Sequence, residues 1–279
     1  MAGKKDKISQ SDEHNARGIE LADRGWLDEA VNEFKKAIEL DPDSAHAYDN
    51  LATVFAEKGR FVDALEAFVK AVRLEPDNAN VYHYLASFLS SRGFDAAVAL
   101  YKQTLELDPE YVDAHVNLAL TYGDRGMLDE ATASLQKAVE IDPADEAARH
   151  ELAAVLMDAG RHAEAIGHLR RIIKEYPDHT DAYVDLGVAY TAQGFYREAE
   201  RSLLDAVKLQ NEQASAHYHL GSLYLAWEKP DQAYEHLGHA LRLDRDNVTE
   251  WLEDDGLMAE LEHDPKFLAL IGDGAKSKE

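Results

Sequence analysis

The sequence predicts an all-α protein made of about seven similar helix pairs, and three observations support this. Glycines recur at intervals of 34, 34, 33, 34 and 34 residues, at Gly25, Gly59, Gly93, Gly126, Gly160 and Gly194. Prolines keep the same period, at Pro42, Pro76, Pro109, Pro143 and Pro177. Between these markers, apolar residues fall at i, i+3, i+4 and i+7, which is typical of amphipathic helices and not of strands.

Each predicted unit consists of a helix, a glycine turn, a second helix and a proline stop. In the second unit, Tyr48, Leu51 and Phe55 form the apolar stripe of the first helix, and Ala64 and Phe68 belong to that of the second. Proline ends the second helix because it lacks an amide hydrogen. We expect the aspartate after it to cap the next helix, at Asp43, Asp77 and Asp178.

Three positions of the unit, counted from its first residue, carry a resemblance to a known family. Position 8 is always Gly or Ala, position 20 is always Ala, and position 24 is always large and apolar. Small residues let paired helices approach closely, and large ones fill the space beside them. The pattern resembles the tetratricopeptide repeat (TPR) family over residues 11–247. The resemblance implies a right-handed α-solenoid of about seven helix-turn-helix units with a C-terminal capping helix.

The repeat pattern also predicts where the parts of the chain begin and end. We expect a disordered tail (1–10), seven repeats (11–44, 45–78, 79–111, 112–145, 146–179, 180–213 and 214–247), C-terminal capping helices (248–271) and a polar tail (272–279). Glu228 replaces the turn glycine of the seventh repeat. Asn247 and Glu250 are spaced as a capping box, so we expect the first capping helix to start at Asn247. A last short helix should begin at Asp264 and run through Ile271.

Composition excludes several classes of function. The 279 residues include 29 Lys and Arg against 54 Asp and Glu, a formal charge of −25, which disfavours nucleic-acid binding. The basic cluster of Lys4, Lys5 and Lys7 is too small to hold the chain on a membrane. The absence of cysteine excludes disulfides and thiolate catalysis. Because residues 1–15 do not resemble a signal peptide, we expect a cytoplasmic protein.

Motifs for catalysis are not found in the sequence, so we expect no enzymatic activity and no cofactor. Four histidines crowd the last repeat, at His217, His219, His236 and His239. A transition-metal site would need them to converge. We expect His236 and His239 to lie on the side of the second helix that faces away from the first, so we predict no metal site.

In the TPR family, positions 2, 5, 6, 9, 12 and 13 of the repeat line a groove that holds a peptide. At all of these positions except position 6, the charged residues of this chain are acidic: Asp12, Asp23, Asp49, Glu57, Asp113, Asp124, Asp158 and Asp181. Position 6, which in relatives hydrogen-bonds a peptide backbone through asparagine, is Asn in two repeats. The candidate peptide-binding residues are Asn15, Asp49, Asn50, Thr53, His83, Tyr84, Ser87, Asp113, Asn117, His150, Glu151, Asp181 and Asp185.

These observations favour a non-enzymatic adaptor that binds a basic or extended segment of another protein, without nucleic-acid or membrane partners. The alternative is a self-associating scaffold or assembly factor that uses the ends of the solenoid. We expect a monomer, with weak self-association left open. The acidic positions also suit a plain hydrated surface that keeps a repeat protein monomeric. The basic clamp that holds acidic chaperone tails in some relatives is missing, which argues against a heat-shock co-chaperone.

Overall fold

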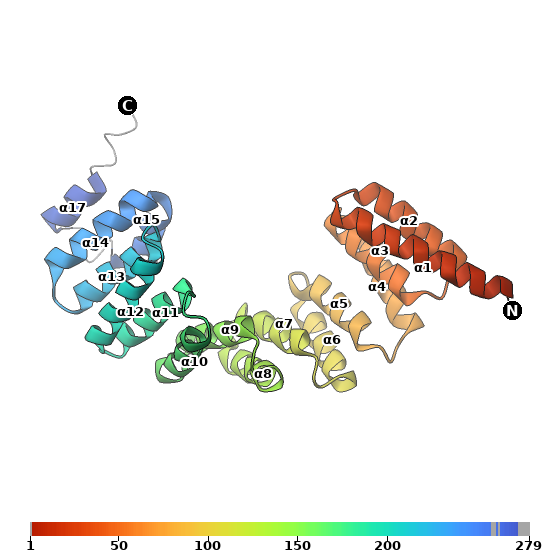
Figure 1. Ribbon diagram of the computed structural model, residues 1–279, viewed down its shortest axis with the longest axis horizontal. Coiled ribbons are helices and arrows are strands. Elements are labelled where there is room, and N and C mark those ends of the chain that lie inside the picture. Colours follow the sequence, from red (N-terminus) through yellow and green to blue (C-terminus); the bar gives the residue numbers. More distant parts are fainter. Residues whose placement is uncertain (1, 258–260, 262, 273–279) are drawn as a thin grey trace, which may run out of the picture. The chain divides into compact units, whose positions relative to one another are not determined.

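The computed structural model describes residues 2–257, 261 and 263–272, and within these ranges every regular element is an α-helix. The chain divides into two compact units, residues 1–142 and 143–279 (Figure 1). Unit 1 contains α1 (Ala2–Asp23), α2 (Leu27–Leu40), α3 (Ala45–Glu57), α4 (Phe61–Leu74), α5 (Ala79–Ser90), α6 (Phe94–Leu107), α7 (Val112–Gly123) and α8 (Leu128–Ile141). Unit 2 contains α9 (Glu146–Asp158), α10 (His162–Glu175), α11 (Thr180–Ala192), α12 (Tyr196–Leu209), α13 (Ala214–Ala226), α14 (Pro230–Leu243), α15 (Arg245–Asp254) and α17 (Pro265–Gly272).

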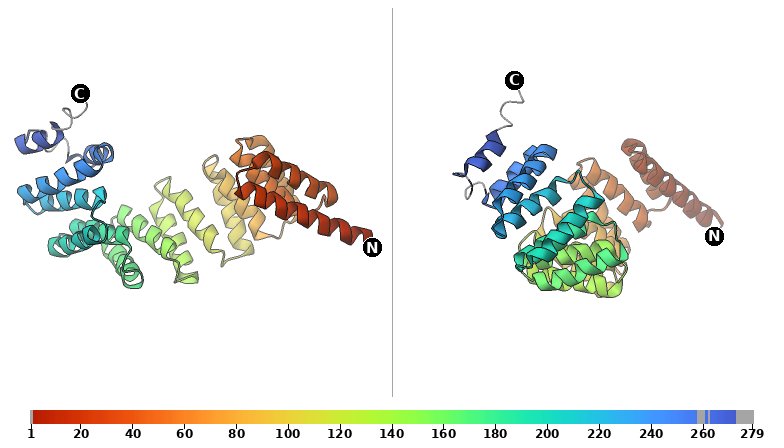
Figure 2. Two further views of the ribbon diagram at one scale, coloured as in Figure 1. Left: turned by 45° about the horizontal axis from the view of Figure 1, so that its top comes forward. Right: turned by 60° about the vertical axis from the view of Figure 1, so that its left-hand side comes forward.

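Within each unit, helices pack in consecutive pairs, and each pair stacks on the next, as Figure 2 shows. The predicted small positions lie where the paired helices meet. The alanines of position 20 have no exposed surface: Ala30, Ala64, Ala97, Ala131, Ala165, Ala199 and Ala233. Gly187 at position 8 lies directly against Leu203 at position 24, since a Cβ atom on this glycine would stand 2.4 Å from Leu203 Cγ. The repeated pattern of small and large residues therefore sets the approach of the two helices.

The turn between paired helices needs one residue in the left-handed region of the backbone. Glycine supplies it in five repeats, with φ between 68° and 77°, at Gly25, Gly59, Gly126, Gly160 and Gly194. Gly93 does not have positive φ, because its repeat is one residue shorter. In the seventh repeat Glu228 takes this conformation with φ 58°, a strained geometry for a residue with a side chain.

The expected capping aspartates are wrong by one residue. The side chains that accept an amide hydrogen at the starts of α3, α5 and α11 belong to Ser44, Asn78 and His179. The aspartate that precedes each of them takes part in the turn that follows proline; the amide of Asp43, for example, donates to the Asp41 carboxylate. The residue after it is the first in a position to cap the helix.

The structure differs from the expected disordered tail over residues 1–10 in that α1 begins at Ala2. Residues 4–17 contain neither proline nor glycine, so the helix of the first repeat continues towards the N-terminus. Residues 6–10 are exposed, and the side chain that follows them, Ser11, is buried and donates its hydroxyl hydrogen to the Ala37 carbonyl at 2.9 Å.

At the other end, α15 starts before the predicted capping box. Asp244 caps this helix, and the amide of Asn247 donates to it, so Asn247 lies inside the helix rather than at its cap. The fully buried side chains Val248, Leu252 and Phe267 form one core with Leu237 of α14. Figure 1 shows α17 beside α14. The predicted polar tail lies outside the described residues, except for Gly272.

Candidate functional site

The first helices of successive repeats contact one another and form what we call the inner face of each unit. This face comprises α1, α3, α5 and α7 in unit 1, and α9, α11 and α13 in unit 2. The thirteen candidate peptide-binding residues all lie on these helices. Their availability for a ligand differs, because several already bond to other parts of the protein.

On this face, position 5 of one repeat can hydrogen-bond to position 6 of the next. Asn50 Nδ2 donates to Asn15 Oδ1 at 3.0 Å, and His150 Nε2 lies 2.7 Å from Asp185 Oδ2. The hydrogen bond with the Asp185 carboxylate raises the pKa of His150 above its usual value. These bonds connect neighbouring repeats side by side.

Asp49 interrupts this series. It occupies position 5, but position 6 of the next repeat is Tyr84, and the described part of the chain provides no hydrogen-bond partner for Asp49 Oδ1. The side chain is only 7 % exposed. Burial raises the pKa of Asp49 to about 7, because a charged carboxylate is poorly solvated there. An unpaired acid in this setting is a candidate contact for a ligand.

Asp49 lines a cavity of about 260 Å³ between α1, α3 and α5, which we call the Asp49 cavity. Its lining residues are Asn15, Ile19, His46, Asp49, Asn50, Asn80, Val81 and Tyr84. Four of them are candidates from the sequence: Asn15, Asp49, Asn50 and Tyr84. Sequence reasoning missed the other four, although His46 and Asn80 occupy position 2 and Ile19 occupies position 9, both groove positions in the family. Tyr111 extends towards this site, and its hydroxyl donates to Asn80 Oδ1 at 2.8 Å.

Other candidates in unit 1 hold the fold together. The buried His83 ring stacks on Tyr111 with centroids 4.9 Å apart, and burial lowers its pKa. Ser87 accepts a hydrogen bond from Tyr101, and the Thr53 hydroxyl donates to the Asp49 carbonyl. Two further candidates on α7, the exposed Asp113 and the half-buried Asn117, do not line the Asp49 cavity.

In unit 2 most of the candidate acids already have partners. Asp185 binds His150, and Gln213 Nε2 donates to Asp181 Oδ1 at 2.7 Å. Glu151 is exposed. The cavity at the far end of this inner face, about 360 Å³, is lined by Ser215, Tyr218, His219, Trp251, Asp254 and Asp255. Its Asp255 carboxylate accepts a hydrogen bond from Tyr218 at 2.5 Å. Asp181, Asp185 and Asp255 therefore differ from Asp49, since each of them accepts a hydrogen bond from within the protein.

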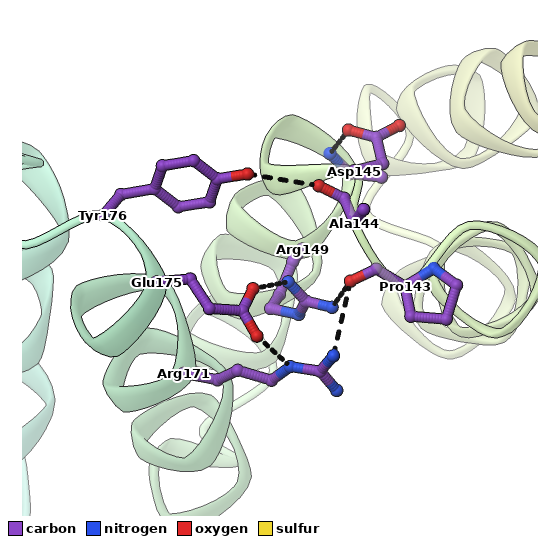
Figure 3. Close-up of polar contacts among 8 residues, drawn as sticks. Pro143, Ala144, Asp145, Arg149, Arg171, Glu175 and Tyr176 are labelled. Atoms are coloured by element: carbon purple, nitrogen blue, oxygen red, sulfur yellow. Dashed lines mark hydrogen bonds and ion pairs between the residues drawn. The ribbon is translucent and has the colours of Figure 1, made fainter.

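Sequence reasoning also missed Arg149, which fills position 4, an aromatic position in several repeats. Its side chain is fully buried, donates to the Pro143 carbonyl and lies 3.4 Å from the Glu175 carboxylate (Figure 3). The half-exposed Arg171 contacts the same carbonyl and the same carboxylate from the surface. Arg149 thus ties the start of unit 2 to the end of α10.

The histidines of the last repeat do not lie as expected. Three of them converge: the His217 ring stacks on His236 and His239, with centroids 5.4 and 5.1 Å apart. The reason is that α14 presents His236 and His239 towards α13 rather than away from it. Burial lowers the pKa of His217 and of His236, which favours neutral rings. Among the residues with described positions, no group of three His, Asp or Glu side chains is arranged to hold a metal ion.

None of the described helices combines the length and the apolar character needed to cross a membrane. Sequence models of the tetratricopeptide repeat match residues 88–156, 124–178 and 156–220, and related repeat models match 18–59, 45–78 and 214–247. No curated protein matches the sequence.

Solved structures with the same architecture include YrrB, described as a TPR protein with an unusual peptide-binding site. It is 25 % identical, with 68 % of this chain and 99 % of that one covered and a TM-score of 0.56. The MamA protein is 26 % identical over 61 % of this chain and 94 % of its own, with a TM-score of 0.55. The C-terminal part of a TPR repeat-containing protein from Cytophaga hutchinsonii is 15 % identical, covers 84 % of this chain and 98 % of its own, and has a TM-score of 0.68.

Proposed function

Since the chain belongs to the tetratricopeptide repeat family, we propose that it is a non-enzymatic cytoplasmic adaptor whose inner face in unit 1 binds a basic, extended segment of another protein. Family membership supports a role in protein–protein interaction. The observation that carries the finer proposal is the Asp49 cavity, where a buried carboxylate without a partner lies among side-chain amides. The peptide-binding site described for YrrB supports a peptide as the ligand.

A cationic side chain of the ligand is the partner that Asp49 lacks. His46 and Tyr84 are the other titratable groups that line the cavity, Asp49 also acts electrostatically on Tyr111, and no Lys or Arg is among the lining residues. A Lys or Arg side chain entering the cavity would pair with the carboxylate in a poorly solvated site, where such an interaction is stronger than on the surface. The Asp49 carboxylate would repel an acidic ligand.

The amides of Asn15, Asn50 and Asn80 supply the second part of recognition. Asn15 and Asn50 already bond to each other, which holds both side chains in place. Each amide retains capacity for further hydrogen bonds, because an amide carries two donors and an acceptor with two lone pairs. An extended peptide backbone can use that capacity, and each such bond contributes about 0.5–1.5 kcal/mol. We therefore expect modest affinity that depends on several contacts acting together.

The alternative, a scaffold that joins copies through the ends of the solenoid, is less well supported. At the C-terminal end, α15 and α17 cover the apolar side of α14 with Val248, Leu252 and Phe267. This leaves little apolar surface of α14 for a second copy. No observation that favours the scaffold is comparable to the unpaired Asp49.

Binding of defined peptides tests the proposal. Fluorescence anisotropy would compare labelled peptides of equal length whose net charge ranges from acidic to basic. We expect affinity to rise with positive charge, to fall about tenfold for Asp49→Asn, and to be unchanged for the matched control Asp185→Asn in unit 2. Equal affinity for acidic and basic peptides would contradict the proposal. So would an equal loss of affinity in Asp49→Asn and Asp185→Asn.

A further inference from the structure

A second cavity lies in unit 2 where α10, α11 and α12 meet, and we call it the α10–α12 pocket. Its volume is about 430 Å³. Its lining residues are Arg170, Ile173, Lys174, Tyr183, Leu186, Tyr190, Glu198, Arg201, Ser202 and Asp205. Apolar and aromatic side chains from α11 form one side, and long charged side chains from α10 and α12 border it. This pocket takes no part in the inner-face site described above.

The same pocket exists in unit 1 at equivalent positions of the repeat. There a cavity of about 290 Å³ is lined by Tyr48, Leu51, Phe55, Asp63, Glu66 and Ala67. The second and sixth predicted repeats start at residues 45 and 180, a difference of 135. Adding 135 to these six numbers gives Tyr183, Leu186, Tyr190, Glu198, Arg201 and Ser202, all of which line the α10–α12 pocket. Equivalent positions of the second and sixth repeats therefore form the same type of pocket in both units.

The two pockets differ in charge. Glu66 in unit 1 corresponds to Arg201 in unit 2, and Glu39 corresponds to Lys174. Arg170 is a third cation, one helical turn before Lys174, and its equivalent in unit 1, Lys35, is also basic. All three are exposed, and within the described chain none of them forms an ion pair. Of the two acids in the pocket, Asp205 is already paired with Lys208 at 2.6 Å, which leaves Glu198, among the described residues, as the one unpaired acid against three cations. Free positive charge thus gathers here in a protein whose formal charge is −25.

We propose that the α10–α12 pocket binds an acidic segment of a partner protein, with one aromatic or large aliphatic side chain inserted between the cations. Tyr183, Leu186 and Tyr190 would contact the inserted side chain, and Arg170, Lys174 and Arg201 would contact carboxylates on either side of it. A small anion would leave the apolar side uncovered, whereas a peptide segment covers both kinds of surface. The adaptor then has two docking surfaces that select opposite charges.

The test uses the full chain and two labelled probes, acetylated and amidated peptides with the sequences Glu-Asp-Phe-Glu-Asp-Leu and Lys-Lys-Phe-Lys-Lys-Leu. The key variant is the double substitution Lys174→Glu and Arg201→Glu, which gives unit 2 the residues that unit 1 has at Glu39 and Glu66. We expect it to bind the acidic probe at least about tenfold more weakly than wild type, with a flatter salt dependence. Asp49→Asn should leave binding of the acidic probe unchanged, which separates this proposal from the proposed function.

Two controls keep the result interpretable. Glu66→Arg alters the matching pocket of unit 1 and should leave binding of the acidic probe to the α10–α12 pocket unchanged. Arg170→Glu alone should weaken binding of the acidic probe. It should not affect the thermal unfolding curve, since the Arg170 side chain is exposed. Equal affinity of wild type and the double variant for the acidic probe would overturn the proposal. It would also be overturned if sedimentation showed that wild type self-associates while the double variant does not, because the occupant would then be a second copy of the chain.

Discussion

The two units share one packing scheme but use the acids of their inner faces differently. In unit 2, Asp185 bonds to His150 of the preceding repeat, and Asp181 accepts a hydrogen bond from Gln213, the residue before α13. In unit 1, Asp49 occupies an equivalent surface, yet its Oδ1 atom finds no partner in the described part of the chain. A carboxylate bonded to a neighbouring repeat stabilises the array, whereas an unpaired buried one destabilises it unless a ligand binds. This difference is the reason why we propose unit 1 as the site of the basic peptide.

The largest effect should come from deleting residues 248–279 of unit 2. The deletion removes Val248, Leu252 and Phe267, three fully buried side chains that each contribute about 1.5–3 kcal/mol by burial. Unit 2 should lose stability and bind a hydrophobic dye, while hydrogen exchange in unit 1 stays unchanged. Deleting residues 2–10, of which 6–10 are exposed, is the control and should have little effect. A truncated chain that is monomeric and equally stable would disprove the capping role.

Arg149→Ala should destabilise unit 2 by about 3–5 kcal/mol, because it removes a buried cation and leaves the Pro143 carbonyl and Glu175 with one partner fewer. Arg171 is the matched control, since it contacts the same two groups from the surface. Arg171→Ala should cost no more than about 1 kcal/mol. Denaturant unfolding measures both. Similar decreases in the free energy of unfolding of the two variants would show that burial does not set the strength of this contact.

Asp49→Asn should stabilise unit 1 at pH 8 by about 1–3 kcal/mol and have little effect near pH 4. The pKa of Asp49 is about 7 in the folded protein and near 3.8 when unfolded, so the unfolded state releases this proton first. Wild-type stability therefore falls as pH rises from about 4 to 7, and the variant lacks this fall. Urea unfolding at several pH values measures it, with the exposed Asp113→Asn as the control. Parallel pH profiles of wild type and Asp49→Asn would refute the assignment.

The smallest effect concerns the turn of the last repeat. Glu228→Gly should stabilise unit 2 by about 0.5–1 kcal/mol, because glycine adopts positive φ without steric strain. Gly160→Ala, at φ 71°, is the mirror experiment and should destabilise by a similar amount. Thermal unfolding measures both. The same sign of change in the two variants would contradict the account of these turns.

Most of the fold followed from the sequence because its determinants recur at fixed spacing. Position 20 is alanine in every repeat, and its burial depends on the helix pair alone. The site was harder to predict, since it depends on bonds between neighbouring repeats. Whether position 5 finds a partner depends on the side chain at position 6 of the next repeat, which is Asn50 for Asn15 but Tyr84 for Asp49. Arg149 and the stacking of His217 were missed because their partners are distant in the sequence or in a loop: Pro143 and Glu175 for Arg149, and His236 and His239 for His217.

The central claim, that Asp49 is an unpaired acid awaiting a cationic ligand, is tested most directly by NMR titration of its carboxyl carbon in the full chain. The account predicts a midpoint near pH 7 for the free protein. It further predicts that a lysine-containing peptide lowers this midpoint, because the cation favours the charged carboxylate. A midpoint near 3.8 in the free protein, or one near 7 that a bound basic peptide does not move, would contradict the claim.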